Sequence, residues 1–133
     1  MKTILRSLFA ITVIFMLAVS LASCTAKPEK VESKLKDKGY EVEMTDKSED
    51  LEMVAESLNL EGEIKAMVAA ISEDGSSEVT VIWFEKKEDA SDAKVILELA
   101  AKYMDYEVVQ SGKIIVFGNG EAFEDACDVA KAK

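Results

Sequence analysis

Acidic side chains are the most abundant groups in this sequence that could carry acid–base or metal chemistry. The 133 residues include 26 Asp and Glu but no histidine, which excludes Ser-His and Cys-His pairs and the usual zinc ligand. A carboxylate-based hydrolase is one alternative, yet no pair of acids stands in an apolar stretch that would raise a pKa. Calcium binding at Glu73-Asp74 with Glu78, or at Glu49-Asp50, is another, although neither matches a D-x-D-x-D-G loop. We therefore predict no catalytic residue, no metal site and no cofactor.

Two cysteines remain as candidates for chemistry, and their surroundings differ. Cys24 ends an apolar leader, whereas Cys127 follows Phe123 by four residues among small alanines. That spacing predicts that Cys127 is a small buried residue on a helix. A reactive or intermolecular thiol at Cys127 is the alternative.

The first 24 residues have the three-part pattern of a secretory signal peptide. Lys2 and Arg6 precede an uncharged apolar run over residues 8–21, and small residues follow it. The run is shorter than the ~20 residues that a membrane-spanning helix needs, so a retained span is the weaker interpretation. Residues 21–24, Leu-Ala-Ser-Cys, resemble the lipobox of bacterial lipoproteins, in which two small residues separate an aliphatic residue from an obligatory cysteine.

This resemblance implies both a location and an anchor. In that family the cysteine is joined to diacylglycerol, the leader is cleaved before it, and the new amino terminus is often acylated, with palmitate as a typical chain. For this chain it implies a cleaved signal peptide over residues 1–23 and lipidation of Cys24. Two or more acyl chains anchor a protein stably, at ~0.8 kcal/mol per buried CH₂. The expected location is the extracytoplasmic face of the cell membrane, or the outer membrane in a Gram-negative cell.

Other interpretations of the leader are an ordinary cleaved signal with a chance cysteine, and an uncleaved anchor. After cleavage, residues 24–133 would suit one domain. They hold all 26 acidic residues and fourteen of the 16 basic ones, a net charge of −12. Because such a charge repels nucleic acid, we exclude a nucleic-acid partner. We expect a short lipidated tether over residues 24–28 and a single domain over residues 29–133.

Hydrophobic periodicity predicts elements in the order α-β-α-β-β-α-β-β-α. The helices are expected at residues 28–38, 46–59, 88–104 and 121–130, and the strands at 40–45, 63–72, 79–84, 106–110 and 113–117. Residues 63–72 also fit a helix, but the turn cluster over residues 73–77 favours a hairpin with the strand that follows. We predict an α+β fold with two layers and a mainly antiparallel sheet. It has a ferredoxin-like βαββαβ core, an extra hairpin strand, and flanking N- and C-terminal helices.

Four lysines recur near one face of the first predicted helix: Lys27, Lys30, Lys34 and Lys38. They could rest on anionic lipid headgroups, at ~1 kcal/mol per lysine close to the surface. They could equally form a solvated helix face, since Glu29 and Glu32 flank Lys30. Both interpretations remain open from the sequence.

These patterns predict a lipid-anchored extracytoplasmic protein that acts as a non-catalytic binding or accessory module of the bacterial cell envelope. Its expected partners are membrane lipid, through Cys24, and an envelope protein, while the sequence does not predict an oligomeric state. The alternatives are a small carboxylate-based hydrolase and an acidic, cation-binding surface protein. Two carboxylates converging in a deep apolar cleft would favour the enzyme. An exposed apolar patch would favour partner binding.

Overall fold

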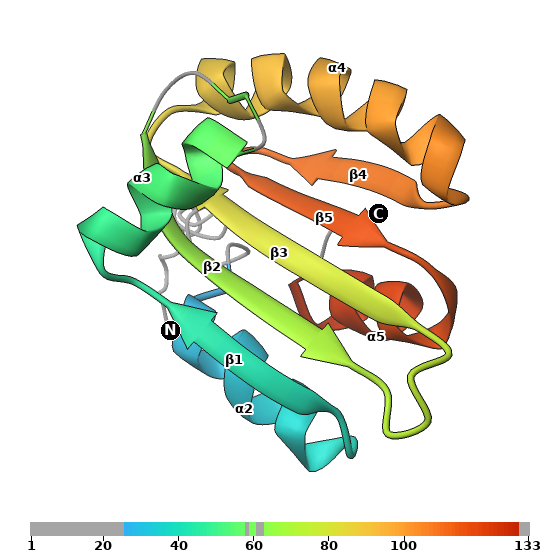
Figure 1. The fold of residues 1–133 in the computed structure, drawn as a ribbon. Helices are drawn as coiled ribbons and strands as arrows, with labels where there is room; N and C mark the ends of the chain where they lie inside the picture. The colour runs from blue at the N-terminus through green and yellow to red at the C-terminus, as the bar shows by residue number, and fades with distance from the viewer. Residues whose placement is uncertain (1–25, 58, 61–62, 131–133) are drawn as a thin grey trace, which may run out of the picture.

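A computed structural model describes residues 26–57, 59–60 and 63–130, so the predicted signal peptide and Cys24 lie outside the described residues. Figure 1 shows the arrangement of the helices and strands. The helices are α2 (Pro28–Asp37), α3 (Ser48–Ser57), α4 (Lys87–Met104) and α5 (Gly120–Ala130). The strands are β1 (Glu41–Thr45), β2 (Ile64–Ile71), β3 (Glu78–Phe84), β4 (Glu107–Ser111) and β5 (Ile114–Gly118).

The strands form one antiparallel sheet in the order β1-β2-β3-β5-β4 (Figure 1). Helices α3 and α4 of the βαββαβ core lie on one face, and the flanking helices α2 and α5 cover the other. The predicted α+β class, antiparallel sheet, extra hairpin strand and flanking helices are therefore confirmed. The extra strand is β5, which lies between β3 and β4 and leaves those two strands parallel to each other. In the other half of the core, β1 and β2 pair directly, so no strand lies between them as the split βαβ unit of a ferredoxin-like core requires. Because helices cover both faces of the sheet, the domain has three layers and not the two predicted.

The ambiguous segment 63–72 is strand β2, as the hairpin interpretation predicted. Ala66, Val68 and Ala70 are buried on one face and alternate with more exposed residues, which is the period of a strand. The turn that follows is held by Asp74, whose Oδ1 accepts hydrogen bonds from the Ser72 and Ser76 hydroxyls and the Ser76 amide. This local network fixes the pairing of β2 with β3.

Two hydrophobic clusters lie on opposite faces of the sheet, and we call the one between the sheet and helices α2 and α5 the α2–α5 cluster. On one face, Val31 and Leu35 of α2 and Ala126 of α5 pack against the sheet. On the other face, the buried side of α4 packs on β3 and β5. The neighbouring aromatic residues Trp83 and Phe84 of β3 are both buried, and they belong to the clusters on opposite faces of the sheet. The predicted burial of Cys127 is also confirmed, because its side chain lies in the α2–α5 cluster.

The backbone at the end of β5 lies unusually close to the backbone at the start of β3. A Cβ atom at Gly118 would overlap the Glu78 carbonyl oxygen and would lie 2.6 Å from the Val79 Cα. Beside it, the Asn119 amide donates to the Glu78 carbonyl at 2.9 Å, and Asn119 Oδ1 accepts from the Glu78 amide at 3.0 Å. Only glycine fits at position 118, and this contact sets where α5 begins.

Candidate functional site

The chain enters the folded domain at Ala26, within the segment predicted as a tether. Ala26 is only 9% exposed and belongs to the α2–α5 cluster. Its carbonyl oxygen accepts a buried hydrogen bond from Trp83 Nε1 at 2.8 Å. A buried indole N–H needs such a partner, and a buried carbonyl needs such a donor. The position of Ala26, two residues after Cys24, is therefore fixed relative to β3.

The four lysines predicted to touch lipid are spread along the whole length of α2. Lys27 precedes the first turn, Lys30 and Lys34 are exposed on the helix, and Lys38 lies beyond its last residue. Ten residues of helix are about 15 Å long, so Lys27 and Lys38 mark opposite ends. Lys38 Nζ also lies 4.0 Å from the Asp125 carboxylate of α5. Contact of this stripe with lipid stays a prediction.

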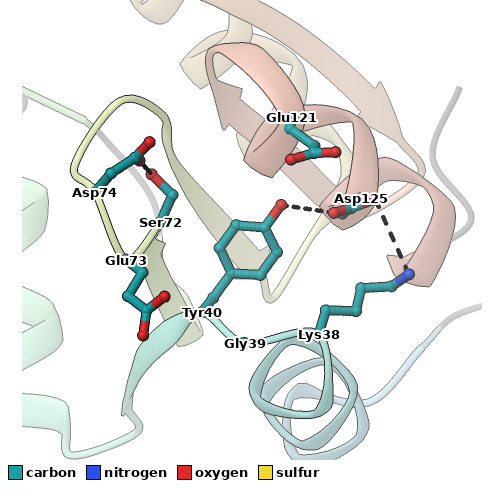
Figure 2. Close-up of a pocket in the computed structure, with 8 residues that line it drawn as sticks. All are labelled: Lys38, Gly39, Tyr40, Ser72, Glu73, Asp74, Glu121 and Asp125. Carbon is teal, nitrogen blue, oxygen red and sulfur yellow. Dashed lines mark hydrogen bonds and ion pairs between the residues drawn. The ribbon is translucent and has the colours of Figure 1, made fainter.

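A cleft of about 650 Å³ lies at the Lys38 end of the domain. Three segments that are distant in sequence meet there, and we name it the Tyr40 cleft. Its lining consists of Lys38, Gly39, Tyr40, Ser72, Glu73, Asp74, Glu121 and Asp125. Figure 2 shows Tyr40 between the turn after β2 and helix α5, with its hydroxyl donating to Asp125 Oδ2 at 2.6 Å.

Two groups in the Tyr40 cleft have shifted pKa values. Partial burial, the hydrogen bond to Asp125 and the nearby Glu121 carboxylate raise the pKa of Tyr40 well above its ordinary value. The backbone and hydroxyl of Ser76 and the Ser72 hydroxyl lower the pKa of Asp74 to about 2. At neutral pH Tyr40 is thus a hydrogen-bond donor and Asp74 a carboxylate.

These shifts do not suit acid–base catalysis. A general acid requires a raised carboxyl pKa, whereas the pKa of Asp74 moves in the opposite direction. Asp125 is partly exposed and is already engaged by Tyr40 and Lys38, rather than isolated in an apolar pocket. Among the described residues, no group of three or more acidic or cysteine side chains could hold a metal ion. The turn acid Asp74, considered above for calcium, is used within its own turn.

The outer face of α4 carries a second candidate site that the sequence analysis missed. Val95, Leu99 and Tyr103 are 61%, 58% and 91% exposed, and we call them the α4 stripe. Residues four apart share a helix face, so the three side chains form one row. The row lies opposite the buried side of α4, which includes Leu97. The same four-residue spacing is visible in the sequence and could have revealed the stripe.

The last residue of this helix, Met104, follows the buried residues Ala93 and Leu97 at helical spacing, yet it is 48% exposed. The helix is capped one residue later by Asp105, whose backbone is left-handed with φ of 61°, and Ala101 provides the last buried contact instead. Met104 therefore extends the apolar surface at the carboxyl end of the α4 stripe.

The chain matches no known protein-family model, and it has no significant match among curated proteins or solved structures. Of the helices in the described part of the chain, none has both the length and the apolar character that crossing a membrane requires.

Proposed function

We propose that this protein is a lipid-anchored, extracytoplasmic binding module of the bacterial cell envelope, and that it engages an envelope protein through the α4 stripe. The leader ending in Leu-Ala-Ser-Cys supports the anchor. The α4 stripe supports the binding role and is the observation that carries the proposal. The absence of histidine favours a binding role over an enzyme that uses Ser-His or Cys-His pairs.

The α4 stripe has no structural use within the domain. The inner side of the helix already fills the space above β3 and β5 with Ala90, Ala93 and Leu97, all at most 1% exposed. Single exposed apolar residues are ordinary, but three in one row on a helix are typical of a surface that docks into a groove. Tyr103 at 91% exposure is of the residue type that most often anchors an interface.

Site-specific photocrosslinking of the full chain in native membranes tests the binding role. A photoreactive benzoylphenylalanine replaces Leu99, and the matched control carries it at the exposed position Ser33 of α2. We expect a discrete protein adduct from position 99 and none from position 33. Adding Tyr103→Asp should lower the adduct yield roughly tenfold, the cost of losing one interface anchor. Identical adducts from both positions, or an adduct unaffected by Tyr103→Asp, would contradict this role.

The anchor is tested by intact-mass analysis of membrane-extracted protein. The proposal expects a chain that begins at Cys24 and carries the added mass of diacylglycerol. Cys24→Ala should abolish the diacylglycerol mass and leave the leader uncleaved, because cleavage follows lipidation, while Cys127→Ala, which changes the other cysteine, should preserve both lipidation and cleavage. A retained leader, or an unmodified amino terminus released into the medium, would refute lipid anchoring.

A further inference from the structure

A second pocket, of about 690 Å³, lies at the end of the domain where Ala26 enters the fold. We call it the Trp83 pocket. Its apolar lining is formed by Pro28, Met44, Ala66, Trp83 and Phe84, and its charged lining by Glu29, Asp46, Lys65, Lys87 and Lys113. The lining thus combines two buried aromatic residues with several charged ones.

The three lysines of this pocket come from three separate elements of the fold. Following the order of the sheet, the acid Asp46 comes after the edge strand β1, whereas Lys65 lies in β2 and Lys87 opens α4 after β3. Lys113 belongs to the turn that joins β4 to β5. None of the three lysines has an ion-pair partner within 4.0 Å among the described residues. Because Glu29 and Asp46 share the lining with these three lysines, the pocket carries a net charge of +1, in a chain whose net charge is −10.

The pocket is also close to the proposed anchor. The carbonyl of Ala26 is bonded to Trp83, which forms part of the pocket wall. Cys24 precedes Ala26 by two residues in the sequence, and two extended residues span at most ~7 Å. The Tyr40 cleft lies at the other end of β2, about 25 Å away by the length of an eight-residue strand. A lipid joined to the chain two residues before Ala26 would therefore be tethered nearer to the Trp83 pocket than to the Tyr40 cleft.

We infer that the Trp83 pocket receives an anionic phospholipid of the membrane that holds the anchor. Lys65, Lys87 and Lys113 contact the headgroup phosphate, and the apolar lining accepts the adjoining part of the acyl chain. Lysine side chains close to an anionic membrane surface are attracted to its headgroups. An apolar pocket lining beside such lysines suits a ligand that has both a charged group and an apolar chain. This inference rests on the proposed lipid anchoring, and it assigns lipid contact to lysines outside the stripe on α2.

Trp83 is the single tryptophan of the chain, and its fluorescence reports on the pocket directly. The lipidated full protein is reconstituted into phosphatidylcholine vesicles that contain a few per cent of spin-labelled lipid, with the nitroxide near the top of the acyl chain. The label is carried either by phosphatidylglycerol or by phosphatidylcholine. We expect the anionic labelled lipid to quench Trp83 at least about twofold more, and higher salt to reduce this preference by screening.

The variant that tests the lysines is Lys65→Glu/Lys87→Glu/Lys113→Glu. A matched control makes the same charge change outside the pocket lining, at the exposed Lys36 and Lys102 and the half-buried Lys94. The pocket variant should lose the preference for anionic lipid and the control should keep it, with both variants retaining their far-ultraviolet circular dichroism.

The outcomes separate the two proposals. If the protein does not float with the vesicles at all, the lipid anchor is wrong. If it floats but the pocket variant quenches like the control, or if native Trp83 shows no lipid preference, the pocket assignment is wrong. Inorganic phosphate added without vesicles should leave the emission of Trp83 unchanged. A phosphate effect to which vesicles add nothing would overturn the assignment to lipid.

Discussion

The hydrogen bond between Trp83 and Ala26 can be tested by Trp83→Phe, which keeps an aromatic ring in the core but removes the N–H donor. The Ala26 carbonyl then loses its buried partner, which costs about 1–3 kcal/mol. The smaller ring forfeits apolar burial worth about 1 kcal/mol more. We therefore expect the free energy of unfolding to fall by about 2–4 kcal/mol, which lowers the urea midpoint by about 1–2 M.

The assay is urea unfolding followed by far-ultraviolet circular dichroism, combined with amide hydrogen exchange. The amides of Lys30 and Val31 bond to the Lys27 carbonyl and so report on the first turn of α2. In Trp83→Phe they should exchange faster than global destabilisation alone requires, because the anchored start of the helix is released. Phe84→Leu is the control, since it weakens the opposite face of the sheet without removing a hydrogen bond.

The Val31 amide should be less protected in Trp83→Phe than in Phe84→Leu when the two variants are compared at equal stability. Equal protection would refute this prediction. That result would mean that the Trp83 hydrogen bond does not hold the entry of the chain into the domain. A urea midpoint unchanged by Trp83→Phe would contradict the expected magnitude as well.

Three further predictions concern other parts of the domain. Gly118→Ala should lower the free energy of unfolding, measured in urea, by at least about 2 kcal/mol, because its Cβ would overlap the Glu78 carbonyl. Gly112→Ala is the control. Its Cβ meets open space, so it should lower the free energy of unfolding by only about 1 kcal/mol. Asp74 has a folded pKa of about 2 against an ordinary 3.8, so its contribution to stability is present above pH 3.8 and is lost as the pH falls toward 2. Asp74→Asn should therefore flatten the stability profile measured between pH 5 and pH 2, and a parallel profile would count against these hydrogen bonds. The Cys127 thiol should react with a maleimide only after unfolding, and prompt labelling of the native protein would disprove its burial.

The sequence predicts the elements well because each is defined by local periodicity. The strand at 63–72 is the difficult case, since its apolar residues fit both periods, and the turn residues that follow decide the outcome. The placement of β5 between β3 and β4, by contrast, cannot be predicted from local periodicity. It depends on where α4 returns the chain across the sheet, and no local pattern encodes that return.

The candidate sites differ in the same way, because local spacing indicates some of them and only the fold brings the residues of the others together. The α4 stripe has a spacing of four that can be recognised in the sequence, but an exposed row and a buried row of apolar residues have the same period on a helix. The Tyr40 cleft depends on a hydrogen bond between residues 85 positions apart, and the Trp83 pocket gathers Lys65, Lys87 and Lys113 from three separate elements. Such groupings arise only from tertiary packing. A helical periodicity argument could find only the lysines of α2.

The strand order has one further consequence, for aggregation. It leaves β1 and β4 at the two borders of the sheet, and each is only five residues long. Bordering strands can recruit strands from other molecules and so start a growing ladder. Here β1 exposes Glu41 and Glu43, and β4 exposes Glu107. Like charges meeting border to border would repel, so densely crowded copies of this domain should resist forming continuous sheets.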